Sequence, residues 1–119
     1  RVGGARTDPE ARLAARAVAG SSLVKAAVHG GDPNWGRVVC ALGYSGAALE
    51  LGRLSVSIGG VPVFARGAPV DPDLELVREA FERREVEISA DLGLGTGEGE
   101  AWGCDLSEEY VHINADYTT

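Results

Sequence analysis

The feature that most constrains the fold of this chain is an alternating run that two adjacent glycines divide near its middle. In residues 53–58 apolar side chains occupy every second position, which predicts a half-buried strand. Gly59 and Gly60 suit a two-residue hairpin turn, and residues 61–64 return as a second strand. Pro62 restricts that second strand to a sheet edge, or places the proline at the strand's start. The sequence therefore predicts a sheet that contains an antiparallel hairpin.

Two stretches carry a helix-start signal followed by proline. Thr7 or Asp8 can cap a helix that begins at Pro9, and the pair Asp71-Pro72 repeats the device. The expected apolar faces comprise Leu13, Ala14, Ala17 and Val18 in the first helix and Leu74, Val77 and Phe81 in the second. Residues 23–28 are a short apolar run that fits a strand or a helix.

Residues 32–37 combine a helix start, an aromatic residue, a glycine and an arginine. Asp32 is a good N-cap and Pro33 fits the first helical position, so we expect a helix to begin here. Trp35 and Arg37 would then lie in its first turn, where the helix dipole attracts anions. Both side chains also fit structural roles, as a core anchor and an ion-pair donor, and we favour that interpretation.

The last third of the chain predicts further strands. Residues 85–92 alternate as a half-buried strand, and residues 101–104 and 110–114 are expected to follow as strands. The glycine-rich residues 93–99 match neither phosphate-loop pattern, and Glu98 would repel a phosphate. We expect a flexible connector there.

Helices and strands are thus partly segregated along the chain, which is typical of an α+β fold. We expect a mixed or antiparallel sheet with helices packed on one face. The length of 119 residues favours a single domain over residues 1–119, large enough to bury a core.

Charge and cysteine content narrow the partners and the location. Lys and Arg number 11 and Asp and Glu 18, so the net charge of −7 argues against nucleic acid or an anionic membrane as main partner. Cys40 and Cys104 lie in apolar runs without CxxC spacing, which predicts buried free thiols. Free thiols suit a reducing compartment, so we expect a cytoplasmic protein.

Few residues could carry chemistry by themselves. His29 with Asp32 is a candidate metal or acid–base pair, although no further ligand stands at metal spacing. Cys104 beside Asp105 is a candidate nucleophile, but an apolar setting raises a thiol pKa. These residues form no complete catalytic set, and we expect no metal and no bound cofactor.

The C-terminal residues are polar but are interleaved with apolar anchors. Asn114 can both donate and accept hydrogen bonds, and Thr118 and Thr119 add hydroxyl groups. Val111, Ile113 and Tyr117 would hold this stretch in place. A polar terminus held in that way can line a pocket.

Four segments together resemble the ornithine acetyltransferase family of arginine biosynthesis, also called bifunctional glutamate N-acetyltransferase. They stand in the family's order, and the resemblance covers essentially all of the chain. The segments are 22–25, 31–37, 101–106 and 110–115, followed by Tyr117 and Thr119.

The resemblance implies a precursor that cleaves itself before an internal threonine into an α and a β chain. That threonine, at the start of β, takes the acetyl group from N-acetylornithine and passes it to glutamate, with its own amine as base. An oxyanion hole from the α chain stabilises the intermediates, and some members also accept acetyl-CoA as donor. The expected partners are the α chain and the remainder of the β chain, in an α2β2 heterotetramer.

The same resemblance makes this chain the C-terminal part of β, with no catalytic residue of its own. Thr7 and Thr96 are internal and lack the family's cleavage context. The family's substrate-contacting asparagine, and the threonine five residues later, match Asn114 and Thr119. We expect these two to hold the α-amino and carboxylate groups of the substrate. Residues 31–37 are expected to be scaffold near the site.

Two other functions remain open on the residues alone. A stand-alone binding module would meet a partner through the glycine loop or an acidic face, without catalysis. A small cysteine hydrolase would use Cys104 and His112. A nucleophile-bearing segment upstream in the complete gene product would distinguish the acetyltransferase from the binding module.

Overall fold

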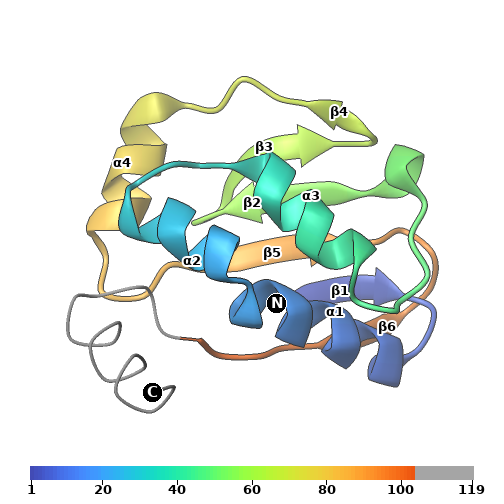
Figure 1. Ribbon diagram of the computed structural model, residues 1–119. Helices are drawn as coiled ribbons and strands as arrows, with labels where there is room; N and C mark the ends of the chain where they lie inside the picture. Colours follow the sequence, from blue (N-terminus) through green and yellow to red (C-terminus); the bar gives the residue numbers. More distant parts are fainter. Residues whose placement is uncertain (104–119) are drawn as a thin grey trace, which may run out of the picture.

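The computed structural model describes residues 1–103, which form a six-stranded mixed sheet with helices packed against it (Figure 1). In chain order the elements are β1 (Val2–Ala5), α1 (Asp8–Gly20), α2 (Ser22–His29), α3 (Trp35–Gly43), the short 3-10 helix η1 (Leu51–Arg53), β2 (Ser55–Ile58), β3 (Val61–Ala65), β4 (Ala68–Pro69), α4 (Leu74–Glu82), β5 (Ile88–Asp91) and β6 (Gly97–Gly99). The strand order across the sheet is β4-β3-β2-β5-β1-β6. β1 runs parallel to β5, and the other neighbouring strands are antiparallel.

The predicted hairpin is confirmed as the β2–β3 pair. Gly59 and Gly60 form the turn with φ values of 59° and 81°, a region that glycine enters without strain. Ile58 and Val61 are paired directly across that turn. Pro62 is the second residue of β3, and β4 covers the outer side of that strand. The proline therefore lies near the start of the strand, which is one of the two positions that the sequence predicts for it.

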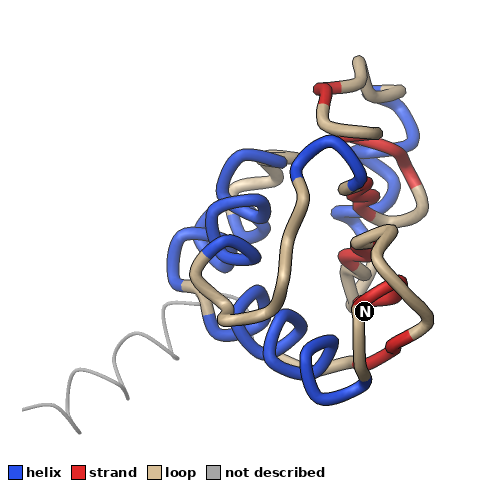
Figure 2. The backbone as a smooth tube through the Cα atoms, turned by 90° about the vertical axis from the view of Figure 1, so that its right-hand side faces the viewer, coloured by secondary structure: helices blue, strands red, loops and turns tan. Residues whose placement is uncertain are grey.

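Helices α1, α2 and α3 lie together over one face of the sheet, as Figures 1 and 2 show from two sides. The core lies between these layers. It combines the inward-facing strand residues with small side chains of α1, and these small side chains let the helix approach the sheet closely. Its members include Val2, Ala11, Ala14, Ala15, Val38, Leu42, Leu54, Val56, Ile58 and Val63. The predicted α+β class, with helices on one face of a mixed sheet, is confirmed.

Each α-helix within residues 1–103 begins at a side-chain cap, although two caps differ from the prediction. The caps are Thr7, Ser21, Asn34 and Asp73. Ser21 starts α2, so the ambiguous run at residues 23–28 is helical. Asn34 caps α3 in place of Asp32, whose carboxylate instead accepts a hydrogen bond from the Asn34 amide at 3.2 Å.

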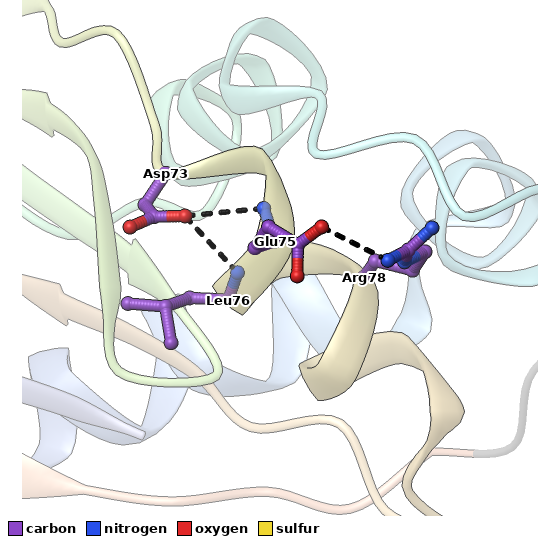
Figure 3. A network of polar contacts seen from close by, with 4 residues as sticks. All are labelled: Asp73, Glu75, Leu76 and Arg78. Atoms are coloured by element: carbon purple, nitrogen blue, oxygen red, sulfur yellow. Dashed lines mark hydrogen bonds and ion pairs between the residues drawn. The ribbon is translucent and has the colours of Figure 1, made fainter.

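The start of α4 follows the same rule. The Asp73 carboxylate accepts hydrogen bonds from the backbone N–H groups of Glu75 at 3.1 Å and Leu76 at 3.3 Å (Figure 3). Glu75 also pairs with Arg78, one turn further along the exposed face. The predicted cap Asp71 is therefore wrong, because the helix begins two residues after the predicted start.

Three predictions about burial are wrong. Leu13 is 45% exposed because α1 turns Ala11, Ala14, Ala15 and Val18 towards the sheet. Leu74 is 72% exposed, since it precedes the turn of α4 that packs through Val77 and Ala80. The thiol of Cys40 is exposed, because α3 buries Val38 and Leu42 instead.

The glycine-rich stretch is a packed part of the sheet and not a flexible connector. Residues 97–99 form β6, which pairs with β1 and contacts α1. A Cβ atom at Gly97 would overlap the backbone carbonyl of Thr7, and one at Gly95 would lie 2.7 Å from the carbonyl oxygen of Ala5. These glycines therefore permit a close backbone approach. No helix within residues 1–103 is both long enough and apolar enough to cross a membrane.

Candidate functional site

A groove of about 710 Å³ lies between α2 and the segment that joins α4 to β5. A volume of this size is typical of sites for small molecules or short peptide segments. The floor of the groove is apolar and is formed by Val18, Val24, Val28, Phe81, Val86 and Ile88. Val18 and Val24 belong to the core, and the other four are partly buried against it. The groove therefore offers apolar surface that the described part of the chain only partly covers.

Charged side chains surround that floor on both sides. Lys25 and His29 come from α2, where their spacing of four residues puts them on one helix face. Arg83 and Arg84 stand on the opposite side, in the segment after α4, next to two glutamates at positions 85 and 87. The groove thus has an apolar floor and a rim of mixed charge, to which two elements contribute cationic groups.

Strands β1 and β5 form one end of the groove. The Ala90 N–H donates a hydrogen bond to the carbonyl oxygen of Arg1 at 2.9 Å, and Val2 is paired with Ala90. Glu87 and Glu100 also line the groove, so its lining carries charges of both signs.

Two of the four family-like segments meet at this groove. Val24 and Lys25, from the first of them, line one side. Residues 101–103, from the third, line the end, where Trp102 is 77% exposed. They are brought together because β6 returns the chain beside α1, which precedes α2.

Residues 31–37 do not line the groove, and they have a structural role. The Trp35 ring stacks on Phe64 of β3, with ring centroids 5.1 Å apart. Arg37 Nη1 donates a hydrogen bond to the Leu23 carbonyl oxygen at 3.0 Å, so it links α3 to the first turn of α2. The structural interpretation is supported only in part: Trp35 is 36% exposed although its ring stacks on Phe64, so it is no core residue. The partner found for Arg37 is a carbonyl group and not the carboxylate of an ion pair.

The other predicted site residues are placed only in part. His29 lines the groove, whereas Asp32 contacts the Asn34 amide. Within residues 1–103 no group of three His, Cys, Asp or Glu could hold a metal ion, so that pair gains no third ligand there. The predicted substrate contacts Asn114 and Thr119, and the hydrolase candidates Cys104 and His112, lie outside the described residues.

Sequence reasoning did not identify the groove itself. The arginines at positions 83 and 84 read as the exposed end of a helix, and nothing in their local pattern predicts α2 as their neighbour. The available signal was indirect, since segments 22–25 and 101–106 both belong to the family resemblance. Their shared role in the groove depends on tertiary packing.

Comparison with known proteins places this geometry in one family. The sequence model of the ArgJ family matches residues 1–119. The arginine biosynthesis bifunctional protein ArgJ of Deinococcus radiodurans is 55% identical over all of this chain, which spans 30% of that relative. The protein of the same name from Thermus thermophilus is 52% identical, and the chain spans 31% of it. The crystal structure of arginine biosynthesis bifunctional protein argJ from Bacillus halodurans superposes with a TM-score of 0.90 at 41% identity, covering 98% of this chain and 55% of that one.

Proposed function

The chain belongs to the ArgJ family, and on that premise we propose that it forms part of an acetyltransferase of arginine biosynthesis. The observation that carries the proposal is the match of the family over every residue of the chain. The complete protein would move an acetyl group from N-acetylornithine to glutamate, as a glutamate N-acetyltransferase. Acetyl-CoA is a candidate second donor, no bound cofactor is required, and we propose a cytoplasmic location.

The proposed chemistry proceeds through an acetyl-threonine whose nucleophile lies outside this chain. The threonine oxygen attacks the acetyl carbonyl of N-acetylornithine, the amide bond breaks, and the ornithine amine leaves with a proton. The amine of glutamate then attacks the ester carbonyl and releases the threonine hydroxyl. The products of one cycle are therefore ornithine and N-acetylglutamate.

Within this scheme the chain would supply scaffold and substrate-binding groups, as the C-terminal portion of the β chain. Asn114 and Thr119 are the residues proposed to bind the substrate. An amide can satisfy both an ammonium and a carboxylate, and a hydroxyl adds a donor. Groups held in this way orient the acyl carbon for attack. The proposed partners are the α chain and the remainder of β, assembled as α2β2.

Expression from the complete coding region, followed by intact-mass and N-terminal sequence analysis, tests the proposal. We expect two chains. The C-terminal one, the β chain, should begin at a threonine and contain residues 1–119. A single uncleaved polypeptide would contradict the self-processing mechanism. It would favour the alternative that the chain is a stand-alone binding module.

A further inference from the structure

The groove between α2 and the 83–87 segment has an apolar floor whose occupant can be inferred. Val28, Phe81 and Val86 are only partly buried, although they pack against the core. Apolar surface at the bottom of a concave site gains free energy when another apolar group covers it. The exposed indole of Trp102 stands at the same place. The groove is therefore a surface that another segment can complete.

The chain itself enters the groove where the described residues end. Gly103 lines the groove, and a Cβ atom there would lie 2.5 Å from the carbonyl oxygen of Ala19. This backbone thus lies directly against the last turn of α1. Residues 104–119 continue from that point, and 16 residues at about 3.3 Å each reach roughly 50 Å when extended. The longest dimension of the molecule is 41 Å, so the segment can reach every part of the groove.

The composition of residues 104–119 matches the groove in charge and in pattern. The segment carries four carboxylate side chains and no lysine or arginine. The rim carries the cations Arg83, Arg84 and Lys25, together with three glutamates at positions 85, 87 and 100. Val111 and Ile113 alternate with polar neighbours, so an extended chain would present both to the same side. An apolar floor next to the adjacent pair Arg83 and Arg84 fits such a segment.

We propose that this groove is the docking site of the chain's own residues 104–119, with Val111 and Ile113 against the floor and the acidic side chains towards the arginines. Docking of this kind would set the positions of Asn114 and Thr119. Only that consequence rests on the proposed function. The docking itself stands on the groove and on the segment's composition.

Disulfide trapping tests the proposal without any activity measurement. In the protein expressed from the complete coding region, with Cys40→Ser and Cys104→Ser, one cysteine is placed on the floor by Val28→Cys. A second is placed by Val111→Cys, Ile113→Cys or His112→Cys. Mild oxidation should form a disulfide between the two cysteines. Digestion with trypsin should then release peptides 26–37 and 85–119 as one disulfide-linked pair, which mass spectrometry identifies. We expect position 111 or 113 to trap several-fold faster than position 112, because only one side of the segment faces the floor.

One control and one alternative floor position keep the test decisive. Tyr44→Cys replaces the floor cysteine with one that is 91% exposed and does not line the groove, and it should trap slowly with every partner. Phe81→Cys supplies a second floor position, in the separate tryptic peptide 79–83, should Val28→Cys disturb folding. Equal trapping at all positions, trapping only between two molecules, or no trapping at either floor position would overturn the proposal.

A charge-reversal series tests the rim independently. Replacing Arg83 and Arg84 by glutamate should slow trapping several-fold, because the acidic segment would then meet like charges. Combining this change with Glu108→Arg and Glu109→Arg should restore the rate. An unchanged rate in both variants would contradict the assigned orientation of the segment.

Discussion

Gly97 shows how a residue without a side chain fixes one edge of the sheet. It is buried in β6, and a Cβ atom at this position would overlap the backbone of Thr7. The strand can therefore approach the β1–α1 connection only because the position is glycine. The adjoining Glu98 N–H donates to the Asp8 carboxylate at 3.0 Å, a bond that depends on the same approach.

We expect Gly97→Ala to destabilise the chain by about 1–3 kcal/mol, the usual cost of forcing an added group into a packed site. Gly3→Ala is the matched control, because it lies in the paired strand β1 and a Cβ atom there meets nothing within 4 Å. Urea unfolding of both variants measures the difference. Equal midpoints would show that β6 does not need this close approach.

A second prediction at the residue scale concerns the proposed substrate contact at Asn114. Asn114→Ala in the complete protein should lower kcat/KM for N-acetylornithine roughly tenfold or more, since a hydrogen bond to a charged group is worth about 1.5–3 kcal/mol. Tyr44→Ala serves as the control, because Tyr44 is 91% exposed at the C-terminal end of α3, and it should leave kcat/KM unchanged. Wild-type kcat/KM in the Asn114 variant would remove this residue from the site.

At the scale of single elements, the start of α4 depends on one carboxylate. Asp73→Ala removes the acceptor of two backbone hydrogen bonds (Figure 3), so it should cost about 1 kcal/mol. Asp71→Ala changes the same side chain two residues earlier, where the sequence alone had placed the cap. It should change stability by less than about 0.5 kcal/mol. Thermal unfolding that ranked the two variants the other way round would restore Asp71 as the cap.

The elements also show which parts of the fold the sequence could predict. The β2–β3 hairpin was predictable because its alternation and its two glycines are local signals. The cap positions were missed by two residues, since Asp-Pro marks a helix start only approximately. The strand β6 was missed because glycines carry no strand pattern, and its hydrogen bond to Asp8 spans 90 residues. The groove was missed for the same reason, because its two walls meet only in the folded chain.

At the scale of the whole molecule, the chain belongs to the ArgJ family, and its described residues 1–103 form a layered α+β unit that carries an amphipathic groove. It spans 30% of the Deinococcus relative, so the complete activity must be sought in a longer protein. Two of the family-like segments lie at the groove, and the proposed docking of residues 104–119 there would position the proposed substrate contacts. The proposed acetyl transfer rests on the family membership, which covers every residue of the chain.

The most direct test is the stoichiometry of products formed by the protein from its complete coding region. With N-acetylornithine and glutamate supplied together, we predict ornithine and N-acetylglutamate in equal amounts. Without glutamate, we predict that each enzyme molecule is acetylated once and that the reaction then stops. Release of ornithine with free acetate, or a folded protein that transfers no acetyl group, would contradict the account.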